Sequence, residues 1–165
     1  HDALPIYGGV FLHCQGVIGN SAQIARGQGI ANTIETNSAW TKAADVPCDW
    51  DPSKAINAFS DYLAQYGDDL KAVICDNDDM SSAVQAEANA KGREDIVCIG
   101  VDGNQGPLQM VKEGTLQATV LQDGVGQLQA GIDAITKSIN GETVEKEYSV
   151  PFVVVTSENV DQYLQ

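Results

Sequence analysis

Three apolar runs in this chain each end in polar side chains suited to ligand binding. The runs, each with the polar residues that follow it, are 72–75 with Asp76-Asn77-Asp78, 96–101 with Asp102-Gly103, and 118–121 with Gln122-Asp123. Short apolar runs that alternate with helical segments are typical of parallel strands buried on both faces. Ligands of open α/β sheets bind outside the carboxyl ends of such strands. The sequence therefore predicts a polar site at one edge of one sheet.

The order of the expected elements indicates the α/β class. We expect strands at 10–14, 42–46, 72–75, 96–101, 116–121 and 150–155. Expected helices begin at Ser21 and Pro52, span 79–90, 107–112 and 125–139, and begin again near Ser157. This alternation predicts a doubly wound parallel sheet in a three-layer α/β/α arrangement.

Capping residues mark the first two helices. Ser21 is expected to cap the first helix, and Asp51, followed by Pro52, the second. The apolar side of the first helix is expected to carry Ile24, Ile30 and Ile34.

Charge and length restrict the partners. With 165 residues, 43% of them hydrophobic, the chain is long enough for one ordinary core. Nine basic against 23 acidic residues give a formal charge of −14, which disfavours nucleic acids and anionic membranes because their phosphates would be repelled. No apolar run is long enough to cross a bilayer, so we expect no membrane insertion by this segment.

The four cysteines show no metal-binding or redox spacing. Cys14, Cys48, Cys75 and Cys98 form no Cys-x-x-Cys pair, and three of them lie in or at the end of apolar runs. We expect buried free thiols. A Cys14–Cys75 disulfide remains open if those strands are neighbours, although paired strands rarely offer the required geometry.

Motifs for cofactor binding are incomplete. The turn before Ser21 lacks the Gly-Lys-Ser/Thr of a phosphate loop. Gly27 and Gly29 give only part of a dinucleotide fingerprint, because Asn32 stands where the third glycine belongs, and tight helix packing is expected to explain them. We therefore expect no cofactor and no metal site.

Two possible catalytic motifs are also weak. Asp76-Asn77-Asp78 resembles the nucleophile loop of haloacid-dehalogenase-like phosphatases, but no second carboxylate closely follows Asp102 to complete the magnesium site. His13 has no Ser or Cys partner at a recognisable spacing and is interpreted as a strand-end histidine.

The first residues carry an unusual signature. His1 to Ile6 back-translate without a mismatch onto an adaptor used in short-read sequencing, and the last base of that adaptor also fits the start of a Tyr7 codon. We expect residues 1–7 to be a non-native, adaptor-derived leader and the natural protein to extend upstream of Gly8.

A set of short motifs from Val10 onward closely resembles the ribose/galactose-type periplasmic binding proteins, the solute receptors of ABC importers. The motifs are, in order, Gly19-Asn20-Ser21, Arg26-Gly27-x-Gly29, Asp49-Trp50-Asp51, Asn77-Asp78-x-Met80, Val101-Asp102-Gly103 and Ala118-Thr119-Val120-x-Gln122. The resemblance implies a two-lobed type I receptor that closes around a monosaccharide, with an ABC permease as its partner. It also implies a periplasmic or extracellular, lipid-anchored location and no catalytic residue.

The resemblance implies a division of the chain as well. Residues 8–122 would form the C-terminal, ligand-binding lobe, and 123–148 would supply a helix and crossover that pack on the missing N-terminal lobe. Residues 149–165 would return through the hinge as a strand and a terminal helix. This division accounts for the apolar stripe of the helix expected at 125–139, which otherwise lacks a surface to cover.

Site residues follow from the same resemblance. Hydrogen bonds to sugar hydroxyls are implied for Arg26, Asn77, Asp102 and Gln122, whereas Trp50 would stack on the ring and Val17 would line the pocket. Val101 replaces an aromatic residue found in some ribose receptors, which leaves the sugar open.

One alternative shares this lobe architecture, namely the effector domain of a lac-repressor-like transcription regulator. The acidic charge and the tail Val153-Val154-Val155-Thr156-Ser157-Glu158-Asn159 favour a receptor, because those regulators commonly end in an arginine-containing strand tail.

Overall fold

A six-stranded sheet organises the chain. The computed structural model describes residues 8–165, so the expected leader at 1–7 lies outside the described residues. The strands are β1 (Gly9–Gln15), β2 (Trp40–Pro47), β3 (Leu70–Cys75), β4 (Val97–Asp102), β5 (Ala118–Leu121) and β6 (Val153–Thr156). The α-helices are α1 (Ser21–Thr36), α2 (Pro52–Tyr66), α3 (Asp78–Ala90), α4 (Gln105–Glu113) and α5 (Gly124–Ile139).

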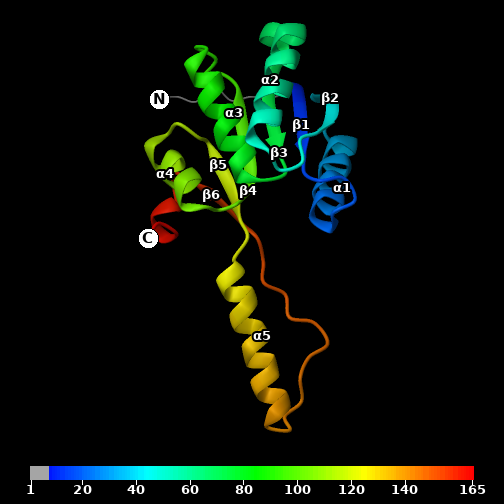
Figure 1. Ribbon diagram of the computed structural model, residues 1–165, viewed down its shortest axis with the longest axis vertical. Coiled ribbons are helices and arrows are strands. Elements are labelled where there is room, and N and C mark those ends of the chain that lie inside the picture. The colour runs from blue at the N-terminus through cyan, green and yellow to red at the C-terminus, as the bar shows by residue number, and fades with distance from the viewer. Residues whose placement is uncertain (1–7) are drawn as a thin grey trace.

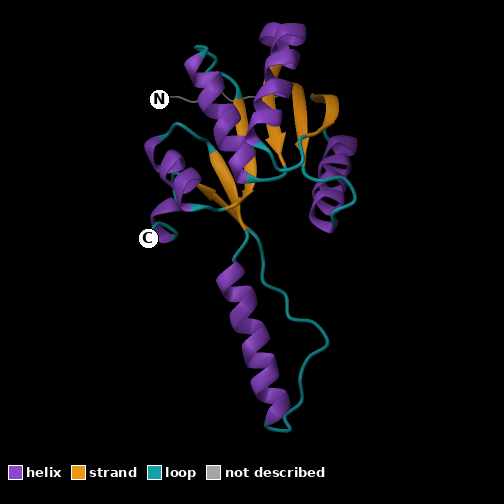
Figure 2. Ribbon diagram, viewed as in Figure 1, coloured by secondary structure: helices purple, strands orange, loops and turns teal. Residues whose placement is uncertain are grey.

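The strand order confirms the doubly wound α/β fold. The order is β2-β1-β3-β4-β5-β6, and each neighbouring pair is parallel except β5–β6 (Figure 2). The chain moves from β1 outward to β2 and then back across β1 to β3. This reversal creates a switch point between β1 and β3, the place at which ligands of open α/β sheets bind.

The two faces of the sheet are covered unequally. Right-handed crossovers place α1 on one face and α2, α3 and α4 on the other. The main core cluster agrees, because it contains Leu12 and Cys14 but not Phe11, which lines the hollow beside α1 together with Ile30 and Ile34. That cluster is centred on α2 and α3 packed against β1, β3 and β4.

Local chemistry explains most element boundaries. Asp51 caps α2 by accepting a hydrogen bond from the Ser53 amide at 2.7 Å, as the sequence predicts. For α1, however, Asn20 is the cap, because its side chain accepts from the Ala22 amide, and Ser21 already belongs to the helix.

Several details differ from the expectations. Ile24 on α1 is 57% exposed, because only part of that helix faces the sheet. The expected tight packing is absent at Gly29, because a Cβ added to this residue would have no atom within 4 Å. Beyond β6, the expected terminal helix is only a short 3₁₀ turn, Val160–Gln162.

All four cysteines are free and buried, which agrees with the expectation for thiols in a core. Cys14 and Cys75 lie opposite each other on the parallel pair β1–β3, yet no disulfide joins them.

Helix α5 lies apart from the sheet. Figure 1 shows it extending away from the strands, with residues 140–152 returning beside it to β6. Its apolar stripe is solvent-exposed throughout, with exposed fractions of 79% for Val125, 73% for Leu128, 57% for Ile132, 62% for Ile135 and 80% for Ile139. A helix with an unburied stripe of this kind lacks the surface that would stabilise it.

Close packing at one glycine gives a stability prediction. A Cβ at Gly100 would lie 2.4 Å from Ser81 Oγ and 2.7 Å from the Asn77 carbonyl oxygen. Gly100→Ala should therefore lower the free energy of unfolding by about 1–3 kcal/mol. Urea denaturation measures the change. The control Gly29→Ala lies in open space within α1 and should raise the same free energy by up to about 1 kcal/mol; equal effects of the two variants would contradict this packing.

Candidate functional site

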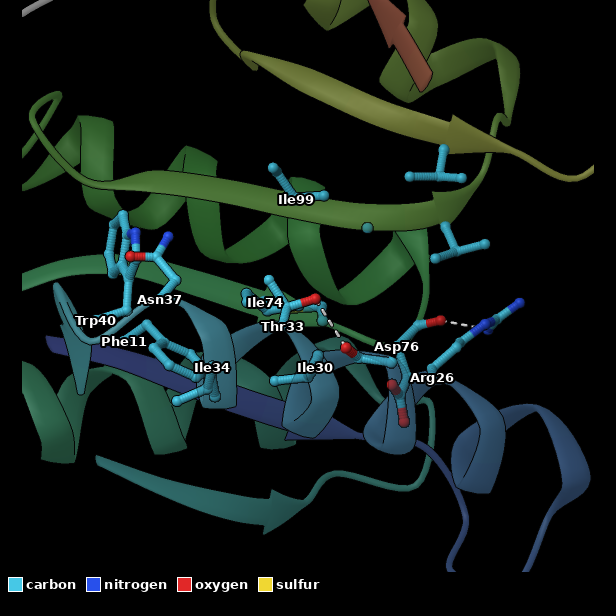
Figure 3. Close-up of a pocket in the computed structure, with 15 residues that line it drawn as sticks. Phe11, Arg26, Ile30, Thr33, Ile34, Asn37, Trp40, Ile74, Asp76 and Ile99 are labelled. Carbon is cyan, nitrogen blue, oxygen red and sulfur yellow. Dashed lines mark hydrogen bonds between the residues drawn. The ribbon is translucent and has the colours of Figure 1, made fainter. Parts of the chain in front are cut away.

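Arg26 connects four segments at the carboxyl edge of the sheet. From α1, its Nη1 donates to the backbone carbonyl of Asp76 after β3, and its Nη2 donates to Gln122 Oε1 after β5 at 3.0 Å. The guanidinium carbon lies 5.8 Å from the ring centroid of Trp50, in the turn after β2. Figure 3 shows Arg26 reaching past Asp76 at the mouth of the groove beside α1. Three of the predicted site residues are thus in contact.

The turn that carries Trp50 is held in an unusual conformation. Asp49 and Trp50 both have positive φ, at 55° and 65°, which is uncommon for residues with side chains. The Asp51 amide closes the turn on the Cys48 carbonyl at 2.8 Å. A Cβ at Gly16 would come within 2.2 Å of the Trp50 ring, so the β1–α1 turn forms a close support for the indole.

Asn77 lies at the start of α3, next to the Asp76 carbonyl that Arg26 binds. Its Oδ1 caps the helix by accepting from the Met80 amide at 3.1 Å, and the residue is only 9% exposed. The cap uses the oxygen and leaves the Nδ2 hydrogens as donors for a ligand.

Asp102 ends β4 with a φ of 149°, and Gly103 follows with a φ of 78°. The bend is held by the fully buried Asp78, whose Oδ2 accepts from the amides of Gly103 at 2.8 Å and Asn104 at 3.1 Å. Its Oδ1 accepts from the Thr119 hydroxyl at 2.5 Å. Asp78 therefore fixes the direction in which the strand presents Asp102.

Burial and neighbouring charges raise the pKa of two carboxyl groups. For Asp102, burial raises the pKa most and the charge of Asp78 adds to it, whereas a backbone hydrogen bond from Asp78 and the Arg26 charge lower it. Burial likewise raises the pKa of Asp78 above its ordinary value, against hydrogen bonds that lower it. A ligand that donates hydrogen bonds to Asp102 would stabilise its charged form.

Two hollows adjoin these residues. One, of about 340 Å³, is lined by Arg26 and Gln122 together with Ala22, Ala25, Val101, Val120 and Phe152. The other, of about 410 Å³, runs between α1 and the bare half of the sheet. Val17, which is 45% exposed in the β1–α1 turn, lines neither hollow, and the same holds for Trp50, Asn77 and Asp102. The predicted roles of these four residues in ligand binding stay predictions.

Some residues near the site were not predicted from the sequence. Phe152 reaches the first hollow only because β6 returns beside β5. His13 is fully buried and bonded to Asp45 and Asp76, a partnership between three strands that no local motif indicates.

Asp76 and Asp78, the two carboxylates of the phosphatase hypothesis, are occupied by internal hydrogen bonds. Asp76 contacts His13 and accepts from the Gly16 amide at 2.8 Å, and Asp78 bridges β5 and the β4–α4 turn. Among residues 8–165, no group of three or more His, Cys, Asp or Glu side chains is arranged to hold a metal ion.

Comparison with known proteins decides the family. The family model described as periplasmic binding protein domain matches residues 3–143. The chain belongs to this periplasmic binding protein family. The xylitol-binding protein of Mycolicibacterium smegmatis is 29% identical over 147 residues, which cover 89% of this chain and 42% of that protein. The D-allose-binding periplasmic protein of Escherichia coli is 31% identical over 166 residues, covering 98% of this chain and 52% of that protein.

A solved structure of the same family agrees. The ABC transporter solute-binding protein of Bacillus halodurans with bound myo-inositol is 30% identical and superimposes with a TM-score of 0.83 over 95% of this chain and 54% of that one. This periplasmic binding protein chain spans about half the length of the curated relatives it matches. No helix within the described part of the chain has the length and apolar character needed to cross a membrane.

The buried brace under Asp102 gives a second prediction. Thr119→Val keeps the side-chain shape but removes the donor to Asp78, and should lower the free energy of unfolding by about 1–3 kcal/mol. Thr33→Val is the matched control, because the exposed Thr33 hydroxyl bonds only the Gly29 carbonyl within α1, and should change stability by less than about 0.5 kcal/mol. Chemical denaturation compares them, and equal losses would show that the Asp78 brace is unimportant.

Proposed function

We propose that this chain is the C-terminal lobe of a receptor that binds a monosaccharide or related polyol for an ABC importer. The observation that carries the proposal is the contact of Arg26 with Gln122 and Trp50 at the carboxyl edge of the sheet. Asn77, directly after β3, and Asp102, the last residue of β4, lie at the same edge. Membership of the periplasmic binding protein family supports it.

The residue types suit a polyhydroxylated ligand. The Asp102 carboxylate accepts from two adjacent hydroxyls, and the Arg26 guanidinium donates in a fixed fork. The amide nitrogens of Asn77 and Gln122 donate, because their oxygens already accept from Met80 and Arg26, and the Trp50 ring offers an apolar face to the C–H side of a sugar. Each sugar hydroxyl that faces this lobe can thus find a hydrogen-bond partner.

Closure against a second lobe couples binding to transport. A ligand that contacts both lobes favours the closed state by its differential affinity, and the permease then recognises that state. The exposed stripe of α5 is proposed to pack on the N-terminal lobe, with residues 149–165 returning through the hinge. The chain spans about half of its relatives, which fits one lobe of two.

The remaining properties follow from this proposal. The protein would bind and release its ligand without a covalent step, and so would need no catalytic residue and no cofactor. Its full-length form would lie in the periplasm or be lipid-anchored outside the cell. The partners would be a pentose, hexose or polyol and an ABC permease, with no nucleic acid.

Ligand-induced stabilisation tests the proposal. The protein expressed from its complete reading frame should show a raised thermal midpoint with one or a few members of a panel of D-allose, D-ribose, xylitol, myo-inositol and other pentoses and hexoses. For the sugar that binds, Asp102→Asn should weaken the affinity about ten- to hundredfold, because a charge-assisted hydrogen bond is lost. Calorimetric titration measures the affinity.

Asp61→Asn is the charge-matched control, because Asp61 is exposed on α2, on the opposite face of the sheet from α1. It should leave the affinity unchanged. Stabilisation by no member of the panel, or an Asp102→Asn variant that binds as well as Asp61→Asn, would contradict a sugar site at this edge.

A further inference from the structure

A fully buried histidine links three strands directly beneath the proposed cleft. His13 lies on β1, which pairs with β2 on one side and β3 on the other, and has no solvent exposure. Its Nδ1 is 2.7 Å from Asp45 Oδ1 on β2, and its Nε2 is 3.0 Å from Asp76 Oδ1 after β3. Both ring nitrogens therefore face a carboxylate.

Two flanking carboxylates favour the charged ring. A neutral imidazole donates from one nitrogen only and would point the lone pair of the other at a carboxylate oxygen, whereas the imidazolium donates from both. Burial lowers the pKa of His13. The hydrogen bonds to Asp76 and Asp45 and the charges of these two carboxylates raise it by more than burial lowers it, so the pKa lies above its ordinary value.

Asp76 transmits this arrangement to the site. Its Oδ2 accepts from the Gly16 amide at 2.8 Å, and its backbone carbonyl accepts from Arg26. Gly16 in turn backs the Trp50 ring, since a Cβ there would overlap the indole. Asp76 thus joins the buried histidine to Gly16 through its side chain and to Arg26 through its backbone carbonyl.

We propose that His13 is a positioning residue for ligand binding: its charged ring holds the Asp76 carboxylate against Gly16, and loss of the ring proton loosens the Arg26–Trp50 corner and weakens the site. The inference rests on the proposed function. It predicts that, above the pH at which Asp102 loses its proton, the affinity falls as pH rises through the pKa of His13 in the folded protein.

Other titratable groups near His13 do not reverse this direction. Lys42 pairs with Asp45 at 2.5 Å, and Arg26 binds the Asp76 carbonyl from α1. The nearby thiols stay neutral around pH 7: burial keeps the pKa of Cys75 high, and for Cys14 a hydrogen bond with Cys48 that lowers the pKa is outweighed by one with Cys75 and by burial. His13 is therefore the group whose charge changes in this range.

The stability of the protein is expected to depend on pH in the same direction as the affinity. Because the folded-state pKa is raised, the ion pairs of His13 contribute fully to stability below its ordinary pKa, and the contribution is lost as pH rises through the folded-state value. Stability and affinity should decline together at alkaline pH.

The test is a calorimetric pH profile of the complete protein between about pH 5.5 and 9, where His13 titrates, with D-allose as the probe or, if another panel sugar binds, that sugar. The wild-type affinity should fall about tenfold across this range, the loss of one charge-assisted hydrogen bond. His13→Gln should bind weakly and without this pH dependence. Asp45→Asn keeps an acceptor but removes a charge, and should move the midpoint to lower pH.

Asp95→Asn is the matched control, because Asp95 is also a partly exposed, ion-paired carboxylate but lies near Arg93 and Lys71, away from His13. It should reproduce the wild-type profile. If His13 had only a structural role, His13→Gln would lower the affinity equally at every pH, and Asp45→Asn would not move the midpoint of the pH profile. A wild-type affinity that is flat to pH 9, or a His13→Gln profile equal to wild type, overturns the proposal.

A second measurement needs no sugar. The NMR signal of the Gly16 amide should titrate with the same midpoint as the His13 ring protons, and the midpoint should fall in Asp45→Asn. If no sugar of the panel binds, the proposed function fails while this coupling still supports His13 as a positioning residue for Gly16. A Gly16 signal that stays constant while His13 titrates contradicts the positioning role in either case.

Discussion

Two buried carboxylates on either side of Asn77 hold the carboxyl edge of this sheet in shape. Asp76 turns toward β1 and accepts from the Gly16 amide, whereas Asp78 turns toward β4 and β5 and accepts from Gly103, Asn104 and Thr119. The loops that carry Trp50 and Asp102 depend on these contacts. The two aspartates of a motif that resembles a catalytic loop therefore hold the neighbouring loops in place through internal hydrogen bonds.

The sequence predicted the helices and strands that are determined by residues close together in the chain. Apolar runs located the strands, Asp51 with Pro52 located the start of α2, and the polar ends of β3, β4 and β5 located the edge at which Arg26, Trp50 and Gln122 meet. Contacts set by strand order could not be predicted in this way. His13 meets Asp45 and Asp76 only because β1 lies between β2 and β3, and Phe152 reaches the cleft only because β6 runs antiparallel to β5.

Apolar surfaces are exposed at two places on this chain, which spans about half the length of the relatives that it matches. The stripe of α5 and the bare strands beside α1 are apolar, and large exposed apolar patches mark places where another surface binds. The carboxyl edge of the sheet carries the polar side chains of Arg26, Gln122 and Asp102. A second lobe over this edge would complete both the packing and the ligand cage, and the same closure would exclude water from Arg26 and Asp102, where hydrogen bonds then gain strength.

A crystal structure of the complete protein with its sugar bound is the most direct test of a sugar site at this edge of the sheet. We expect a sugar whose hydroxyls lie within hydrogen-bonding distance of the Arg26 guanidinium and the Asp102 carboxylate, with one face of the ring against Trp50. A sugar bound elsewhere on the lobe, with the Arg26–Gln122 contact unchanged and Asp102 facing solvent, would contradict it.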